Sequence, residues 1–330
     1  MTEEELAALP AHIQFNLRLA SIFLPKALEQ QTALVRKNKR FVHYTSADAA
    51  LKIIGSKRLW MRNTNCMSDY REVQHGKDIL FAFFSDPSKK DKFKAALDSC
   101  ANGVALKALT LFDQWWQDTR FNTYISSISE HNDDEDLHGR LSMWRAFGGS
   151  AARIAIVFRL PFYSPTAENL NILFSPVAYL TEQLAHAEID RVIQNIHANA
   201  DFIRTLDPQN VENCVFNMLT AAVACLKHDG FREECEWRVV YSPNRNASPL
   251  VESCTEIIGG VPQIIYKLPL DKSVSDTIAD LDIAHIFDRL IVGPSPYAWA
   301  MYQAFVAALT NAGVSDAGGK VVISGIPIRG

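Results

Sequence analysis

The chain has 330 residues, of which 48% are hydrophobic and 21% are charged, and its formal net charge is −4. This composition is typical of a folded globular protein and excludes a disordered chain. The weak negative charge does not indicate a nucleic-acid-binding protein, which needs an excess of Lys and Arg. Apolar runs are far shorter than the roughly 20 residues of a membrane span. Because the first residues are also acidic, unlike a signal peptide, we expect a cytoplasmic protein without a membrane partner.

The cysteine pattern does not indicate a metal site. The six cysteines are Cys66, Cys100, Cys214, Cys225, Cys235 and Cys254. No two of them form a C-x-x-C pair, and no His lies at metal-ligand spacing from them. In a cytoplasmic chain such cysteines are mostly small buried side chains, so we expect no metal cofactor.

The first predicted element is an N-terminal helical segment at residues 1–39. Ile13, Leu17 and Leu24 share one helical face, and the Leu24-Pro25 step is expected to break or kink the helix. The alternation of Ile13, Phe15, Leu17 and Leu19 would also suit a strand. A helix here suits both a peripheral layer and the binding of a partner.

Residues 40–330 are predicted to form a single α+β domain with helical insertions at about 71–118 and 181–228. Short segments rich in β-branched and aromatic residues predict its strands. These segments lie at residues 40–46, 59–62, 122–129, 153–160, 175–180, 231–241, 264–268, 290–294, 320–324 and 326–329. Because the helices come in blocks, we expect a mixed, mostly antiparallel sheet of short strands.

The first strand ends in His43-Tyr-Thr-Ser46. Ser46 is a typical N-cap residue for the short helix that follows, and Gly55 is a typical helix stop. Backbone N–H groups at the start of a helix favour anions, and His43 lies just before them.

A polar strand is predicted at residues 231–241. Alternation along a strand places Glu234, Glu236 and Arg238 on one face and Trp237 among apolar side chains on the other. An ion-pair ladder on a solvated face explains this pattern, and so does a polar site on a rigid element.

The ordered motifs of the chain resemble a bacterial family known as domain of unknown function 2971. The resemblance runs from about residue 40 to the end. It is carried by His43-Tyr-Thr-Ser46, the Ser127/Ser129 strand, Met143-Trp-Arg145, Glu234-x-Glu236-Trp-Arg238, Ile291-Val-Gly-Pro294 and Ile326-Pro-Ile-Arg329. Membership of this family implies no established activity.

A second resemblance is to the ADP-ribosyltransferases, which carry three spaced motifs on the strands of their NAD cleft. The first is H-x-T, the second a Ser-x-Ser type strand and the third a catalytic Glu within E-x-E. The corresponding motifs here are His43-Tyr-Thr45, Ser127-Ile-Ser129 and Glu234-Cys-Glu236, in the same order. The resemblance implies an ADP-ribosyltransferase-like fold, with NAD as substrate.

This resemblance also implies roles for the two carboxylates. Breaking the nicotinamide–ribose bond builds positive charge on the ribose, and a nearby carboxylate stabilises that charge and binds the ribose 2′-hydroxyl. Glu236 matches this position. Glu234 would orient or deprotonate the acceptor nucleophile.

Other matching residues would bind NAD. His43 and Thr45 would hydrogen-bond the adenosine-side ribose or the nicotinamide amide. Ser127, with Ser129 on the same face, would support the Glu236 strand or contact the nicotinamide ribose.

Guanidinium groups fork onto phosphate oxygens, so Arg62, Arg145 and Arg238 are pyrophosphate candidates. Trp60, Tyr70 and Trp144 are the candidates for stacking on nicotinamide. The acidic segment 131–136, expected to be a solvated loop, would repel a dinucleotide unless it points away.

Structural interpretations compete with each of these roles. His43 also suits a histidine bonded to a backbone carbonyl, and Glu236 suits a purely structural pair with Arg238 or Arg145. Two functions follow: an NAD-consuming ADP-ribosyltransferase, in a toxin or phage-defence role, or a non-catalytic module of the same fold that binds a nucleotide or protein. In the catalytic case His43, Ser127 or Ser129, and Glu236 should line one cleft, whereas side chains on separate faces would contradict catalysis. The acceptor and the oligomeric state stay open, and no G-x-G-x-x-G or P-loop motif indicates another nucleotide site.

Overall fold

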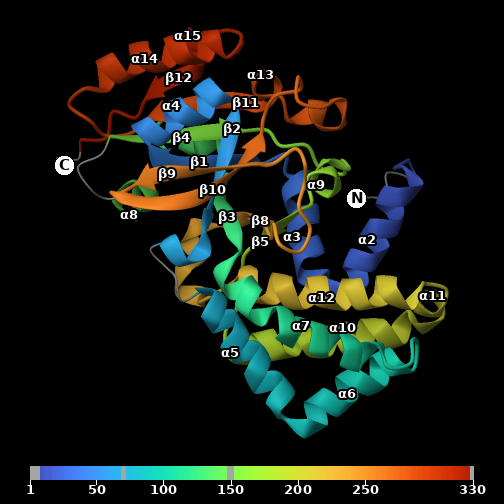
Figure 1. Ribbon diagram of the computed structural model, residues 1–330. Coiled ribbons are helices and arrows are strands. Elements are labelled where there is room, and N and C mark those ends of the chain that lie inside the picture. Colours follow the sequence, from blue (N-terminus) through green and yellow to red (C-terminus); the bar gives the residue numbers. More distant parts are fainter. Residues whose placement is uncertain (1–7, 68–71, 147–151, 328–330) are drawn as a thin grey trace.

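A computed structural model describes residues 8–67, 72–146 and 152–327. Within these residues the fold is α+β, with ten strands in one mixed, mostly antiparallel sheet and the helices in blocks, as expected. Figure 1 shows the sheet in the upper part of the molecule and a block of helices beneath it. None of the described helices is long and apolar enough to cross a membrane.

The main path of the sheet contains eight strands. Their order is β12 (Val321–Ile323), β11 (Phe287–Val292), β4 (Arg153–Phe158), β1 (Arg40–Ser46), β3 (Tyr124–His131), β2 (Arg58–Asn63), β10 (Val261–Pro269) and β9 (Glu252–Ile258). The pair β11–β12 is parallel, and the other neighbours on this path are antiparallel.

The sheet branches at β3. One edge of β3 pairs with β8 (Glu236–Tyr241), which pairs in turn with β5 (Ile172–Pro176). The other edge pairs with β1 at Ser129–His131 and with β2 at Tyr124–Ile125. Strands β1 and β2 therefore pair with opposite ends of the same edge of β3, and they are separated along its middle. The first motif lies at this gap.

The connection from β1 to β2 is α4 (Ala47–Ser56), which begins where the sequence predicts. The Ser46 side chain accepts a hydrogen bond from the Ala49 N–H, as an N-cap residue does. The helix continues past Gly55, and Lys57 ends it in the left-handed conformation with φ 49°. Apolar side chains of α4 and of α14 (Ala298–Asn311) fill a core against the sheet.

Further short helices lie beside the sheet. They include α8 (Leu141–Ala146), α9 (Thr166–Asn169), α13 (Ile283–Ile286) and α15 (Ala317–Lys320). Figure 1 shows α14 and α15 above the sheet, on the side away from the helical block.

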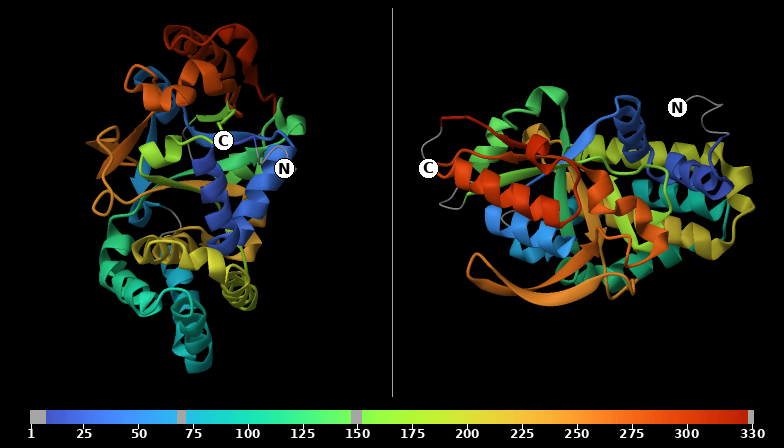
Figure 2. Two further views of the ribbon diagram at one scale, coloured as in Figure 1. Left: turned by 90° about the vertical axis from the view of Figure 1, so that its right-hand side faces the viewer. Right: turned by 90° about the horizontal axis from the view of Figure 1, so that it is seen from above.

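A block of helices lies beneath the sheet (Figure 1). Its helices are α5 (Glu72–Ser85), α6 (Pro87–Asp98), α7 (Val104–Phe121), α10 (Glu182–Ala198), α11 (Ala200–Arg204) and α12 (Pro208–Ala224). Asp207 caps α12 by accepting from the Gln209 N–H, and Pro208 follows at its first turn. The apolar faces of the block share one core, so segments distant in sequence pack as one layer (Figure 2).

The N-terminal segment packs on both the block and the sheet. Helix α2 (Ala11–Phe23) ends at the predicted break, and α3 (Pro25–Arg36) begins at Pro25. Ile22 and Phe23 enter the core of the helical block. Leu34 of α3 is 2% exposed and packs in a cluster with Trp237 of β8.

The structure differs from the sequence prediction at several strands. Strand β9 was not predicted, because its alternating polar residues form the exposed edge of the sheet. Residues 326–327 form no strand, and 328–329 lie outside the described residues. The polar strand begins at Glu236, because residues 229–234 form a 3₁₀ helix and Cys235 takes φ 45°, which ends strand geometry.

The acidic segment 131–136 is only in part the solvated loop that was expected: Asp133 and Asp134 are exposed, but other residues of the segment pack against the protein. His131 is buried, and its Nε2 lies 2.9 Å from Asp136 Oδ1. The buried Arg40 guanidinium reaches Asp133, Asp136 and Asp288 at 2.5–2.7 Å. These pairs neutralise the acidic segment and fix it against β1, because a buried cation requires anionic partners.

Candidate functional site

Strands β3 and β8 bring the second and third motifs together. Their register places Ser127 opposite Arg238 and Ser129 opposite Glu236. Directly opposed residues of an antiparallel pair project from the same face, so these four side chains share one face. Every residue of β8 is buried, so the polar face of the strand does not lie in solvent.

Glu236 forms the centre of this polar face and is 6% exposed. Ser127 Oγ donates to Glu236 Oε1 at 2.5 Å. Arg238 donates to both carboxylate oxygens, from Nε to Oε1 at 2.8 Å and from Nη2 to Oε2 at 3.0 Å. Arg238 Nη1 also donates to the Ala224 carbonyl at the end of α12, which joins the site to the helical block. The Glu236–Arg238 pair favoured by the structural interpretation is therefore present and bidentate.

Lys227 is a functional candidate that the sequence analysis missed. It lies on β7 (Leu226–Lys227), which pairs with β6 (Ala178–Tyr179), and its ammonium is buried. Its Nζ lies 2.8 Å from Glu234 Oε2 and 3.5 Å from Glu236 Oε2. The signal in the sequence is slight, because a single Lys before a turn is usually solvated.

Glu234 lies near Glu236, but not on the strand that the sequence predicts for it. It belongs to the 3₁₀ helix η3 (Asp229–Glu234) and not to the strand, so alternation does not place it beside Glu236. Arg140 Nη1 donates to the backbone carbonyls of Glu233 and Glu234, which fixes this turn. The two glutamates meet through Lys227, and the Glu234 side chain is the more accessible at 29% exposed.

The charge state of Glu236 follows from its partners. Burial alone raises the pKa of a carboxyl, but the charges of Arg238 and Lys227 and the Ser127 hydrogen bond outweigh it, so the pKa of Glu236 is lowered. The backbone N–H of Glu236 donates to the Tyr179 hydroxyl at 2.8 Å, and burial raises the pKa of Tyr179. The carboxylate is therefore ionised and the phenol neutral at neutral pH.

His43 contacts the same site from the gap between β1 and β2. Its Nδ1 lies 2.9 Å from the Ser127 carbonyl oxygen. A carbonyl only accepts, so Nδ1 carries the proton and Nε2 has a free lone pair. Burial lowers the pKa of His43 in spite of this bond, which keeps the imidazole neutral.

His43 and Thr45 nevertheless project from the other face of the sheet. Val42 is the β1 residue opposite Ser129, so Val42 shares the face of Glu236. Alternation then directs His43 and Thr45 to the opposite face. The first motif therefore contacts the site through the Ser127 backbone and does not line one cleft with Glu236.

The predicted phosphate ligands are not gathered in one place. Arg62 donates to the Cys66 carbonyl and to Gln263, and burial lowers its pKa. Arg145 is exposed on α8 (Leu141–Ala146). Arg238 is 2% exposed, and its Nε and Nη2 atoms donate to Glu236. Its guanidinium is therefore not presented to a phosphate.

The aromatic candidates for stacking are core residues where the structure describes them. Trp144 is fully buried against Tyr44, with ring centroids 4.9 Å apart. Trp60 is buried, and the ammonium groups of Lys52 and Lys267 lie over its ring. Tyr70 lies outside the described residues.

Comparison with known proteins supports the family resemblance. Residues 143–239 match the family model described as "Protein of unknown function (DUF2971)". This segment belongs to the DUF2971 family. The DUF2971 segment contains Lys227, Glu234, Glu236 and Arg238, whereas His43 and Ser127 precede it. No curated protein and no solved structure matched the chain.

Proposed function

We propose that the chain is an NAD-dependent ADP-ribosyltransferase in which Glu236 acts on the nicotinamide-bearing ribose. The observation that supports this proposal is the convergence of the three motifs on Ser127. Its carbonyl is bonded to His43 of the first motif, and its hydroxyl is bonded to Glu236 of the third. These residues are 84 and 109 positions from Ser127 in sequence, so local structure does not explain their meeting.

The chemistry requires an ionised carboxylate at the reacting ribose. The C1′–N bond breaks with its electron pair leaving on nicotinamide, and the acceptor nucleophile bonds to C1′ and releases a proton. The Glu236 carboxylate, kept ionised by Arg238 and Lys227, would stabilise the positive charge that develops on the ribose. The ribose 2′-hydroxyl would donate to Glu236 in place of Ser127 Oγ.

Glu234 suits the second role in this reaction. Its carboxylate is more accessible than that of Glu236, and Lys227 connects the two. It would accept the proton of the acceptor nucleophile. The fold around these residues, a branched antiparallel sheet with β1 and β2 parted beside β3, is compatible with an ADP-ribosyltransferase-like cleft, which is part of the proposal.

A non-catalytic module of the same fold is the second candidate. It is favoured by the enclosure of Glu236, since Arg238 binds both of its oxygens, and by the opposite orientation of His43. In this case the Glu236 network serves only to join β8 to β7 and α12.

The test uses NAD labelled in its adenylate half, incubated with the protein and a bacterial lysate. The wild-type protein is expected to release nicotinamide and to transfer label. Glu236→Gln should lower both rates by about 10²- to 10³-fold, because the variant loses the charge that stabilises the transition state. Glu234→Gln should lower transfer more than nicotinamide release.

A further variant, Ser127→Ala, removes the hydroxyl that donates to Glu236. Its matched control is Ser253→Ala on the exposed strand β9. Only Ser127→Ala should alter turnover. Absence of nicotinamide release and of label transfer by the wild-type protein would favour the non-catalytic module.

A further inference from the structure

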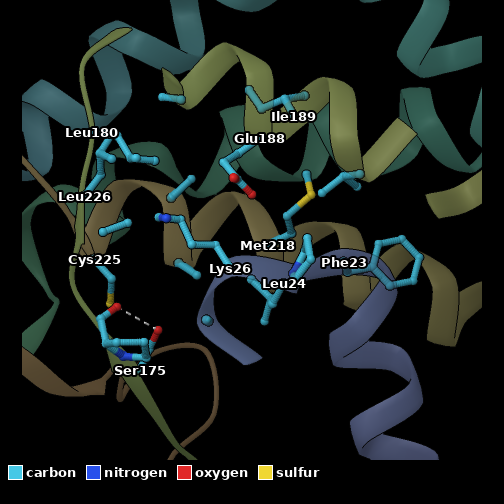
Figure 3. A pocket seen from close by; sticks show the side chains of 18 of the residues that line it. Phe23, Leu24, Lys26, Ser175, Leu180, Glu188, Ile189, Met218, Cys225 and Leu226 are labelled. Atoms are coloured by element: carbon cyan, nitrogen blue, oxygen red, sulfur yellow. Dashed lines mark hydrogen bonds between the residues drawn. The ribbon is translucent and has the colours of Figure 1, made fainter. Parts of the chain in front are cut away.

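An apolar pocket lies between the N-terminal helices, the helical block and β6–β7. Its volume is about 130 Å³. The wall includes Leu24 at the α2–α3 junction, Leu80 of α5, Ile189 of α10, Met218 of α12 and Leu226 of β7. Figure 3 shows these elements arranged around the pocket. An apolar cavity of this size can hold a benzene-sized molecule.

Two side chains of opposite charge line this apolar wall. Lys26 of α3 and Glu188 of α10 both belong to the lining, and Figure 3 shows them within the ring of apolar side chains. Glu188 Oε2 lies 3.4 Å from Arg191, whereas Lys26 has no hydrogen-bond or ion-pair partner among the described residues. The pocket thus offers a free ammonium donor beside a carboxylate acceptor.

Gln30 is a further polar residue of the lining, and its side-chain oxygen lacks a hydrogen-bond donor among the described residues. This Oε1 atom is buried. A buried acceptor without a donor is costly, and a ligand N–H would remove that cost. The polar groups therefore call for a ligand that both accepts and donates and that is uncharged overall.

We propose that this pocket binds a small apolar molecule that carries one carboxamide group. The apolar body fills the space between Leu80, Ile189 and Met218. The carboxamide oxygen accepts from Lys26, and its N–H₂ group donates to Glu188 or Gln30. A neutral amide suits both charged groups at once, because its oxygen accepts from Lys26 and its N–H₂ group donates to Glu188, whereas a carboxylate would face Glu188 and an amine would face Lys26.

The pocket is separate from the proposed transfer chemistry. It adjoins the Glu236 network through β5, where Ser175 lines the pocket and is opposite Arg238 in the register. Ligand binding requires neither NAD nor an ionised Glu236, so this inference goes beyond the proposed function. The two can succeed or fail independently.

The test follows binding of phenylacetamide by NMR with ¹³C-methyl-labelled methionine. Phenylacetamide is expected to shift the Met218 resonance and to leave that of Met301, on α14, unchanged. Ethylbenzene, which lacks the amide, should bind the same site more weakly. No shift at Met218 on adding phenylacetamide would overturn the proposal.

Two variants test the parts of the site separately. Lys26→Met should weaken phenylacetamide binding about 10-fold, the effect of losing one charged hydrogen bond, without weakening ethylbenzene. Lys37→Met, at an exposed position of the same segment, is the matched control. Equal weakening of both ligands, or of neither, by Lys26→Met would contradict the assigned role of the amide.

The second variant, Ala222→Leu, adds volume to the pocket wall and should abolish binding of both ligands. Ala307→Leu on the exposed face of α14 is its control. Binding that survives Ala222→Leu would overturn the assigned location. If Ala222→Leu does not fold, the Met218 shift and the Lys26→Met comparison still decide the question.

Discussion

At the scale of single residues, the site depends on how three polar side chains share one buried carboxylate. Ser127, Arg238 and Lys227 all contact Glu236. Their favourable interactions exceed the effect of burial, so the folded protein holds the pKa of Glu236 below its ordinary value of 4.5. The same contacts serve catalysis and stability, so the two roles require different measurements.

This pKa shift predicts loss of stability in acid. A carboxyl with a lowered folded pKa contributes its full stabilisation above the unfolded value and loses it as the pH falls through the folded value. The free energy of unfolding should therefore decrease as the pH falls below about 4.5. Glu236→Gln should reduce this dependence, measured by urea unfolding between pH 7 and pH 3.

Glu236→Gln should also destabilise the protein at pH 7. It leaves Arg238 and Lys227 buried beside a neutral group, which costs on the order of 3–5 kcal/mol. Glu252→Gln is the control, because Glu252 is exposed and pairs with Arg58 at the edge of the sheet. An acid-unfolding curve that is the same in Glu236→Gln and wild type would contradict the assigned ionisation.

At the scale of elements, the helical block depends on close packing between α5 and α12. Gly76 of α5 faces α12 without a side chain. A Cβ added there would lie 2.6 Å from Val223 Cα and 2.7 Å from the Ala222 carbonyl oxygen. Those neighbours are backbone atoms, so the two helices would have to move apart.

Two glycine variants test this contact. Gly76→Ala should lower the free energy of unfolding by about 1–3 kcal/mol, because overpacking displaces backbone. Gly55→Ala is the matched control, since Gly55 is helical and has nothing within 4 Å of an added Cβ. It should raise stability by about 0.5–1 kcal/mol, because alanine is the better helix former. Equal effects in urea unfolding would show that the α5–α12 contact does not limit stability.

At the scale of the whole molecule, the N-terminal segment connects the helical block to the sheet. Phe23 of α2 packs in the block, and Leu34 of α3 packs with Phe41, Ile128 and Trp237 at the sheet. The predicted division into residues 1–39 and 40–330 stays a prediction, but these contacts make α2 and α3 part of two cores.

Leu34→Ala should therefore destabilise the whole protein. Removing a buried leucine side chain leaves a cavity and costs about 2–5 kcal/mol. Leu137→Ala is the control, because Leu137 is 60% exposed and its truncation should change stability by less than about 0.5 kcal/mol. The measurement is urea unfolding followed by tryptophan fluorescence. An unchanged midpoint for Leu34→Ala would mean that the segment is a dispensable outer layer.

The sequence by itself determined the features that depend on near neighbours. Local chemistry predicts the Ser46 cap and the break at Leu24-Pro25. Periodicity predicts that Glu236 and Arg238 share one face of a strand, and the order of the segments predicts the mostly antiparallel α+β class. The order of the motifs also indicated the DUF2971 family, which the match at residues 143–239 confirms.

Only the tertiary structure decided which of these side chains meet. The β3–β8 register brings Ser127 to Glu236, and the turn at Cys235 removes Glu234 from the strand while Lys227 holds it near. The β1–β3 register, with Val42 opposite Ser129, places His43 on the other face. These outcomes depend on contacts between residues far apart in the chain, whose energies local periodicity does not encode. For the same reason, periodicity did not decide whether the face that carries Glu236 and Arg238 lies in solvent, and the structure shows that it is buried.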